Sequence, residues 1–501
     1  MKIMFIYSAG DGFESSGLLR SWAKMQFGIS YISSMLKSRG HNTGLIVLSS
    51  SQPLNERLIR QHMDEFGPDV VCFTAVFSQY SFIEKAAAFC KKNWPGKFYV
   101  VGGVHATLNP HQVINGPFDA LCVGEGEYPV LELCEHLKEN RKPHEIQNLW
   151  LRTGDKILQN GTRDFIQDLN ALPFADRQMW ATWIKQDASD EITLLAGRGC
   201  PHGCTYCSNH SIRKTAKGRY VRMRSPENIV REIELIYANY PQRRIYLEAE
   251  CIALDKKWAF DLCCKLAEFN ASVNNEITFG CNFRVSGNSV DEDLFAAFEK
   301  ANIRKINIGL ESGSERVRRE VLKRNYSNDD FLRAASMARR HAMAVNVYNL
   351  IGIPGETMDD HMETVRVNRL CQPDNLCTSI FYPYPGTELH KVCLERGLIS
   401  ETVNTSQERR TAVLDLPGFS SAQIQKAYRL FEKRVYKGRF PWWKDLLRSV
   451  YGWMPLGARS ASSRAMARVP VARALRASLK QQLFGAGKTP LAANHTEIRF
   501  K

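Results

Sequence analysis

The sequence predicts an α/β protein with two parallel sheets in tandem. Two observations carry this prediction: short β-rich runs alternate with helical patterns through the first 150 residues, and six further strand-plus-helix units run from about 192 to 395. Such alternation is typical of parallel sheets covered by helices. We expect an N-terminal Rossmann-like, doubly wound domain at residues 1–150, a linker at 151–190, a partial (βα)6 barrel at 191–395 and a helical, basic C-terminal extension at 396–501.

In the first domain, the strand ends are the expected binding edge. Strands are predicted at 2–7, 44–48, 69–74, 98–102 and 120–124, and helices at about 28–40, 55–66, 81–93 and 128–140. Ligands of such sheets bind beyond the carboxyl ends of the strands. Glycines at two of those ends permit close approach of a ligand to the backbone. The candidate ligand-binding residues are Gly102, Gly103, His105, Gly124 and Glu125.

In the second domain, the loops after the strands are expected to carry the chemistry, as in complete barrels. Its strands are predicted near 192–197, 243–248, 277–282, 305–310, 344–351 and 376–382. Directly after the first of them come Cys200, Cys204 and Cys207, with Tyr206 before the third cysteine. Three soft, anionic thiolates suit an iron–sulfur cube and leave one of its irons open. The alternative is a structural zinc site, completed by His202 or His210.

The cysteine spacing resembles that of the radical S-adenosylmethionine (SAM) superfamily. The resemblance implies that the three cysteines hold a [4Fe-4S] cluster and that SAM binds its open iron and is cleaved to a 5′-deoxyadenosyl radical. Later stretches match the family pattern in order along the chain. They supply the candidate SAM-site residues Glu248 and Glu250 after the second barrel strand, Arg284 after the third, Glu311 and Ser312 after the fourth, and Gly352, Ile353 and Pro354 after the fifth.

The first domain resembles the cobalamin-binding domain that precedes the barrel in cobalamin-dependent radical SAM proteins. The similarity covers about 1–145 and rests on Phe27-Gly28-Ile29-Ser30-Tyr31, Gly102-Gly103-Val104-His105 and Gly124-Glu125-Gly126-Glu127. No Asp-x-His-x-x-Gly occurs to supply a lower cobalt ligand. His105 is the nearest imidazole at a strand end, and its alternative role is that of a polar turn residue. A Rossmann-like domain without a corrinoid is the other alternative.

Charge and cysteine usage bound the compartment and the partners. The 14 scattered cysteines indicate a reducing, cytoplasmic compartment, and no run reaches the ~20 apolar residues of a membrane span. Residues 421–501 hold 17 Lys+Arg and three acids, a net charge of +14 out of +15 for the chain. With Trp442, Trp443 and Trp453, this basic C-terminal segment predicts peripheral binding to the inner face of an anionic membrane. The alternatives are a Trp face docked on the barrel and RNA binding, although no RNA-binding motif is present.

The resemblance implies a methyltransferase that acts on an unactivated carbon or phosphorus centre through the cluster, the deoxyadenosyl radical and methylcobalamin. Its expected partners are a small-molecule or lipid-linked substrate and an electron donor such as flavodoxin or ferredoxin; a nucleic acid is not expected. The alternatives are a cyclase or rearrangement enzyme of the same architecture, a tRNA methylthiotransferase, and a non-catalytic cobalamin or redox sensor.

Overall fold

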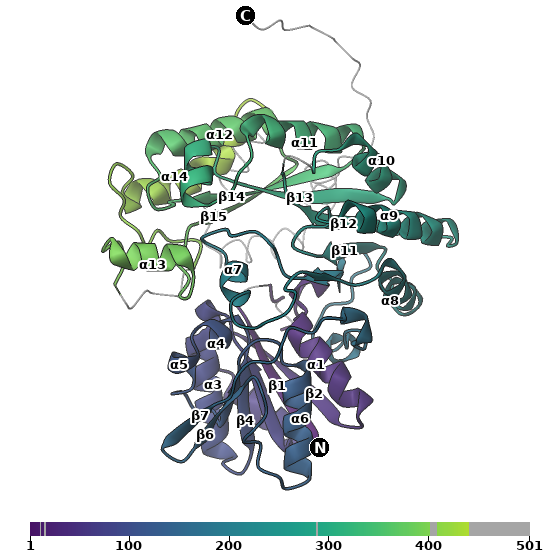
Figure 1. Ribbon diagram of the computed structural model, residues 1–501, viewed down its shortest axis with the longest axis vertical. Helices are drawn as coiled ribbons and strands as arrows, with labels where there is room; N and C mark the ends of the chain where they lie inside the picture. Colours follow the sequence, from purple (N-terminus) through teal and green to yellow (C-terminus); the bar gives the residue numbers. More distant parts are fainter. Residues whose placement is uncertain (11, 15–16, 287–288, 401–407, 440–501) are drawn as a thin grey trace, which may run out of the picture. The chain divides into compact units, whose positions relative to one another are not determined.

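The computed structural model describes residues 1–10, 12–14, 17–286, 289–400 and 408–439 (Figure 1). Residues Met1–Tyr428 form one unit, and Arg429–Lys501 form a second. Both sheets lie in the first unit. The tryptophan-rich part of the basic C-terminal segment lies outside the described residues. Within the described ranges, no helix combines the length and apolarity needed to cross a membrane.

The N-terminal sheet has seven strands in the order β2-β1-β3-β4-β5-β6-β7. Its first five strands pair in parallel, and the last two add an antiparallel hairpin at the edge. The strands are β1 (Lys2–Ala9), β2 (Asn42–Ser49), β3 (Val70–Thr74), β4 (Phe98–Gly102), β5 (Ala120–Cys122), β6 (Leu149–Thr153) and β7 (Lys156–Gln159). The five predicted strands are all present. The sequence did not predict the hairpin, so this sheet continues past residue 150 into the segment expected to be a linker.

Helices cover both faces of this sheet, as a doubly wound fold requires. They are α1 (Phe27–Ser38), α2 (Glu56–Phe66), α3 (Tyr80–Asn93), α4 (Val104–Leu108), α5 (Pro110–Val113) and α6 (Glu127–Lys138). Because side chains alternate along a strand, Ile3 and Phe5 of β1 share a core with α1 and α6, whereas Met4 and Ile6 share one with α2 and α3.

The segment after β7 lies against α1. It contains two short 3-10 turns, η3 (Leu169–Ala171) and η4 (Gln178–Trp180). Trp180 is fully buried and donates its indole N–H to the Ser30 hydroxyl at 2.8 Å. Asp176 accepts a hydrogen bond from Ser33 at 2.6 Å. These contacts bind the segment to the first domain.

The second sheet has six parallel strands in the order β15-β14-β13-β12-β11-β8. They are β8 (Ile192–Leu195), β11 (Arg244–Glu248), β12 (Thr278–Phe283), β13 (Ile303–Glu311), β14 (Ala344–Ile351) and β15 (Asn375–Ile380). The helices that follow them are α8 (Pro226–Asn239), α9 (Lys256–Ala271), α10 (Glu292–Lys300), α11 (Asn328–Arg340), α12 (Met358–Cys371) and α13 (Glu388–Glu395) (Figure 1). The six predicted units of a partial barrel are therefore present.

Three short elements lie close to the cysteines in the sequence: β9 (Gly197–Arg198), α7 (Ser208–Ile212) and β10 (Arg222–Met223). The remaining described elements are the 3-10 turns η1 (Trp22–Lys24) and η2 (Phe77–Gln79), the π-helical turn η5 (Val317–Val321) and the helix α14 (Ser421–Tyr436). β9 and β10 form a two-stranded antiparallel ladder that pairs Arg198 with Arg222. This ladder flanks the cysteine loop on its N-terminal side.

Candidate active site

The cysteine loop begins at a position that only glycine can occupy. Gly199 has φ +88°, and a Cβ there would lie 2.2 Å from the carbonyl oxygen of Tyr220. The loop ends at Cys207, which caps α7 and donates its backbone N–H to the carbonyl of Cys204 at 3.1 Å. Cys204 is buried, and Cys200 and Cys207 are half-buried. Both ends of the loop are thus fixed by the backbone.

The three thiols are partly or fully buried, and one cation, Arg284, contacts them. Burial, with a contribution from the Glu250 charge, raises the pKa of Cys207 to about 11 and raises that of Cys200. The Arg284 guanidinium donates to the Cys204 sulfur at 3.1 Å. Among the described residues, no three of His, Cys, Asp and Glu form a site for a single metal ion. A cube takes its thiolates at separate irons, so the cysteine set is compatible with a cluster.

The two glutamates after β11 have different environments. Glu250 accepts a hydrogen bond from the Asn209 amide of α7 at 2.8 Å, and Tyr220 donates to the same Asn209 side chain at 2.6 Å. Glu250 therefore lies beside the cysteine loop. Burial and the neighbouring Glu250 charge raise the pKa of Glu248 to about 7.

A buried arginine that sequence reasoning missed connects the cysteine loop to the end of β13. Arg324 contacts the Tyr206 hydroxyl at 2.9 Å and a Glu311 carboxylate oxygen at 3.2 Å, and donates to the Gly309 carbonyl at 2.6 Å. Glu311 itself has φ +62°. The local sequence around Arg324 gives no signal of this role, because its partners are distant in the chain at Tyr206 or lie in the preceding strand. It joins the site residues only through the tertiary fold.

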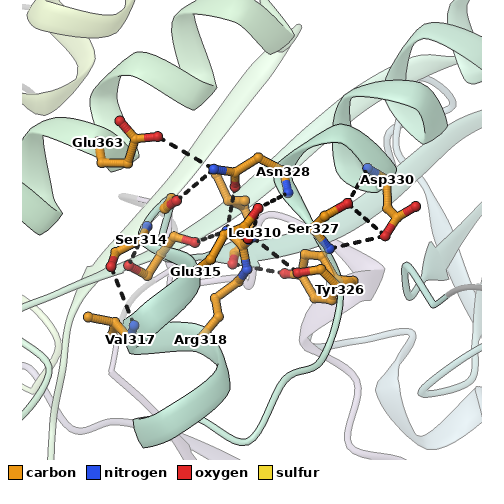
Figure 2. A network of polar contacts seen from close by, with 12 residues as sticks. Leu310, Ser314, Glu315, Val317, Arg318, Tyr326, Ser327, Asn328, Asp330 and Glu363 are labelled. Carbon is orange, nitrogen blue, oxygen red and sulfur yellow. Dashed lines mark hydrogen bonds and ion pairs between the residues drawn. The ribbon is translucent and has the colours of Figure 1, made fainter.

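The turn after β13 is held by a second buried arginine (Figure 2). Arg318 is fully buried and donates to the Ser312 carbonyl at 2.6 Å, to Asn328 at 2.7 Å and to the Tyr326 carbonyl at 3.2 Å. The Ser312 hydroxyl, also fully buried, lies 3.4 Å from that of Thr364 in α12. In this structure Ser312 supports the turn, and its expected contact with SAM stays a prediction.

The turn after β14 is built around a buried carboxyl group. The backbone N–H groups of Gly352 and Ile353 donate to Glu356 at 2.6 and 3.1 Å. Gly352 has φ +81°, and Ile353 and Pro354 are buried beside it. Burial outweighs the two N–H donors and raises the pKa of Glu356 to about 8. Glu356 is therefore a protonated side chain at neutral pH.

We predict that the stability of the cofactor-free Glu356→Gln variant increases relative to that of wild type as pH rises. The unfolded carboxyl titrates near its ordinary pKa of ~4.3, whereas the folded one retains its proton up to about 8. Wild-type stability should therefore fall between these values, by at most ~1.4 kcal/mol per pH unit, and then level off. The glutamine variant lacks this slope. Urea unfolding of both proteins from pH 5 to 9 measures it; parallel curves would contradict the assignment.

The predicted glycines lie at the carboxyl ends of β4 and β5 in the N-terminal sheet, where the loops after neighbouring strands contact each other. Gly102 ends β4. Gly103 has φ +98°, and a Cβ at this position would lie 2.8 Å from the Ala75 carbonyl oxygen. Gly124 has φ +87° and donates to the Thr107 hydroxyl at 3.0 Å. Only glycine permits such a close approach of these loops.

His105 lies below this edge. It is buried between the rings of Phe77 and Tyr80, at centroid distances of 5.2 and 4.7 Å. Its Nδ1 lies 3.2 Å from the Asn109 amide nitrogen, and its buried Nε2 has no hydrogen-bond partner. Burial lowers the pKa of His105 to about 4, so the ring is neutral. Where Nδ1 accepts from Asn109, Nε2 carries the proton, and the choice between a turn residue and a cobalt ligand stays a prediction.

Glu125, a predicted cofactor contact, lies in a network of ion pairs between two parts of the chain. Its carboxylate pairs with Arg198 at 2.9 Å and Arg222 at 2.8 Å, and it accepts the Ile166 N–H at 2.8 Å. Burial opposes its ionisation, but the two arginines outweigh burial and lower its pKa. The structure therefore assigns Glu125 to the contact between the first domain and the β9–β10 ladder.

A cavity of about 460 Å³ opens beside the cysteine loop. It is lined by His202, Cys251, Ala253, Leu254, Lys256, Arg284, Ser286 and Ser289. Arg284 links this cavity to Cys204. Its cations and hydroxyls suit an anionic, hydrogen-bonding ligand group.

Two family models match the chain: the Radical SAM superfamily over residues 194–367 and the B12 binding domain over residues 25–134. The chain thus combines a B12-binding domain with a radical SAM domain and belongs to the cobalamin-dependent radical SAM enzymes. Its cofactors are a [4Fe-4S] cluster, SAM and cobalamin.

The curated relatives include methyltransferases, cyclases and methylthiotransferases. An uncharacterized methyltransferase of Pyrococcus horikoshii is 24% identical over 405 residues, covering 80% of this chain and 85% of the relative. The anaerobic magnesium-protoporphyrin IX monomethyl ester cyclase of Cereibacter sphaeroides is 24% identical and covers 78% of this chain and 63% of the relative. The cytidylyl-2-hydroxyethylphosphonate methyltransferase of Streptomyces wedmorensis is 22% identical, with coverages of 78% and 82%.

A solved structure shares the fold. The radical SAM methyltransferase TsrM of Kitasatospora setae, determined with cobalamin and a [4Fe-4S] cluster bound, superposes with a TM-score of 0.63 at 14% identity, over 79% of this chain and 75% of that one.

Proposed function

We propose that this enzyme transfers a methyl group from SAM, by way of its cobalamin, to an unactivated carbon or phosphorus centre. One observation carries the proposal: α4, at the strand ends of the B12-binding domain, packs against α7, which is capped by Cys207. Leu108 of α4 also lies close to Gly386, in the turn after β15: a Cβ at Gly386 would lie 2.9 Å from the Leu108 Cβ. The corrinoid edge and the cysteine loop are therefore neighbours, as methyl delivery to a radical generated at the cluster requires.

The bound cofactors supply electron transfer, hydrogen abstraction and a methyl donor, which side chains cannot. The chain's residues bind and orient them. Cys200, Cys204 and Cys207 hold the cluster, and Arg284 offsets the charge of the cysteine set. Glu250 and the 460 Å³ cavity offer an anion and cations to the amino and carboxylate groups of SAM. The buried Arg324 joins Tyr206 to Glu311 and excludes water from that side of the loop.

The inner face of the barrel sheet favours a polar substrate. Asn282, Asn307, Asn346 and Asn375 lie in register on four adjacent strands. Asn375 donates to Asn346, and Asn346 to Asn307, each at 2.9 Å. Hydrocarbon packed on these amides would leave unmade those hydrogen bonds that they do not already make to one another, at a cost of ~1–3 kcal/mol per group. A substrate with hydroxyl, amide or nucleotide groups is favoured over a lipid tail or a macrocycle at this face.

Asn346→Leu is accordingly expected to lower substrate-dependent turnover. The leucine removes the acceptor of Asn375 and the donor to Asn307 while keeping the side-chain volume similar. We expect KM to rise by about tenfold, the effect of ~1.4 kcal/mol. Thr378→Ala, on the neighbouring strand β15 but outside the asparagine row, is the control. Equal KM values for Asn346→Leu and wild type would contradict a role for the row in substrate binding.

Product mass tests the reaction type. The reconstituted enzyme is incubated with a low-potential reductant, SAM deuterated on its methyl group and candidate polar acceptors; we propose flavodoxin or ferredoxin as the natural reductant. Methyl transfer predicts a product in which CD3 replaces one hydrogen of the acceptor. A product that loses hydrogens without gaining the label would instead indicate a cyclase, the alternative suggested by the Cereibacter sphaeroides relative.

A further inference from the structure

Four charged side chains join the first domain to the start of the cysteine loop. Glu125 comes from the turn between β5 and α6, Glu127 is the first residue of α6, and Arg198 and Arg222 come from the β9–β10 ladder. We call this set the carboxylate–arginine clasp. Arg198 precedes the first cysteine by two residues, so the clasp lies directly at the base of the loop.

The clasp is buried and its geometry is specific. Arg198 uses one terminal nitrogen for Glu125 at 2.9 Å and the other for Glu127 at 2.5 Å. Arg222 reaches the second Glu125 oxygen at 2.8 Å and the Ile166 carbonyl at 2.8 Å. The side chains of Glu127 and Arg222 are 3% and 2% exposed. Two acids and two bases are thus matched in charge and in hydrogen bonds.

Aromatic rings enclose both cations. The Arg198 guanidinium lies 5.2 Å from the Tyr31 ring centroid, and that of Arg222 lies 5.1 Å from the Phe165 ring. A planar fork held by two carboxylates and a ring has little freedom to move. The β9–β10 ladder is therefore fixed against the turn that begins at Gly124.

Gly124 belongs to the strand-end edge, and Cys200 begins the cysteine loop. We propose that the clasp sets the position of the [4Fe-4S] cluster relative to the corrinoid, with Glu125, Arg198 and Arg222 as positioning residues. Through the clasp, the turn that begins at Gly124 is in charged contact with the strand that precedes Cys200 by two residues. The proposal rests on the two cofactors and not on methyl transfer, so it stands or falls independently of the proposed reaction.

Pulsed EPR of the full-length protein tests the clasp. The protein is reconstituted with iron, sulfide and cobalamin, and the dipolar coupling between the reduced cluster and cob(II)alamin is measured in wild type and Glu125→Gln. The glutamine retains the shape of Glu125 but removes the charge shared by Arg198 and Arg222. We expect unchanged iron and corrinoid contents and a shifted, broader distance distribution. The control is Glu132→Gln, which removes the charge of Glu132 on α6 in its more exposed ion pair with Arg163. It should give the wild-type distribution.

A second variant, Arg198→Lys, keeps the test usable if Glu125→Gln does not fold or does not bind both cofactors. Arg198→Lys keeps the charge, but a single ammonium cannot bridge Glu125 and Glu127 as the fork does. It should also broaden the distribution. A wild-type distribution in a loaded Glu125→Gln or Arg198→Lys protein would overturn the proposal. Loss of corrinoid from both variants would also overturn it, because the clasp would then maintain the fold of the B12-binding domain and not the spacing of the cofactors.

Discussion

Replacing Cys200, Cys204 or Cys207 with alanine is expected to abolish 5′-deoxyadenosine formation. Each cysteine supplies one of three thiolates to the cluster, and the loop offers no spare sulfur: the Gly199 turn and the Cys207 cap fix both of its ends. Without a complete cluster, the electron that cleaves SAM is not delivered. Iron content and deoxyadenosine are measured after anaerobic reconstitution, and both should fall to background in all three variants.

The matched control is Cys264→Ala. Cys264 is exposed on α9 and lies outside the loop, so its removal should leave iron content and SAM cleavage at the wild-type level. The buried Cys263 on the same helix gives a second control in the core. If the control variants lost activity as completely as the loop variants, the loop would have no special role in the cluster.

Gly103→Ala should release the corrinoid while leaving the cluster in place. Gly103 adopts φ +98° and ψ 179°, a region used almost only by glycine, and a Cβ there would lie 2.8 Å from both the Ala75 carbonyl oxygen and the Thr74 hydroxyl. Strain of ~1–3 kcal/mol at such a position must be relieved by moving the turn between β4 and α4. We expect corrinoid affinity to fall by about tenfold or more, since 1.4 kcal/mol is tenfold.

Gly96→Ala is the control for this prediction. Gly96 lies in the exposed turn before β4, has an ordinary φ and would place its Cβ in open space. Corrinoid retained after gel filtration of the reconstituted proteins is the measurement. Wild-type corrinoid content in Gly103→Ala would show that this strand end does not contact the cofactor.

The sequence predicted the two sheets well because local pattern decides buried parallel strands. The apolar runs in β1, β3 and β4 are bounded by turn residues, and the barrel strands show the same pattern. The β6–β7 hairpin was missed because Lys156–Gln159 is exposed throughout and shows no alternation of apolar and polar residues. Its pairing at the sheet edge follows from the tertiary fold alone.

The sequence placed residues in the site most directly where the backbone of a short motif defines them, as in the cysteine loop and the Gly352–Pro354 turn, and their cofactor contacts stay predictions. Contacts with residues distant in the chain could not be predicted. Glu125 is bound to Arg198 and Arg222, 73 and 97 residues later in the chain, and Arg324 contacts Tyr206, 118 residues earlier. Ser312 stands in a matching motif, but its hydroxyl packs on Thr364 of α12. Such pairings arise from how the two domains and the barrel helices pack.

Transfer of label from SAM to the corrinoid tests methyl transfer most directly, because it needs no substrate. The full-length protein, reconstituted with its cluster and with reduced cobalamin, is incubated with SAM carrying a deuterated methyl group. The extracted corrinoid is then weighed by mass spectrometry. A methyltransferase predicts a corrinoid that carries CD3 in wild type, with the yield of labelled corrinoid reduced in Gly103→Ala in proportion to its loss of corrinoid. An unlabelled corrinoid in a protein that still cleaves SAM to 5′-deoxyadenosine would contradict methyl transfer and favour a cyclase or rearrangement enzyme.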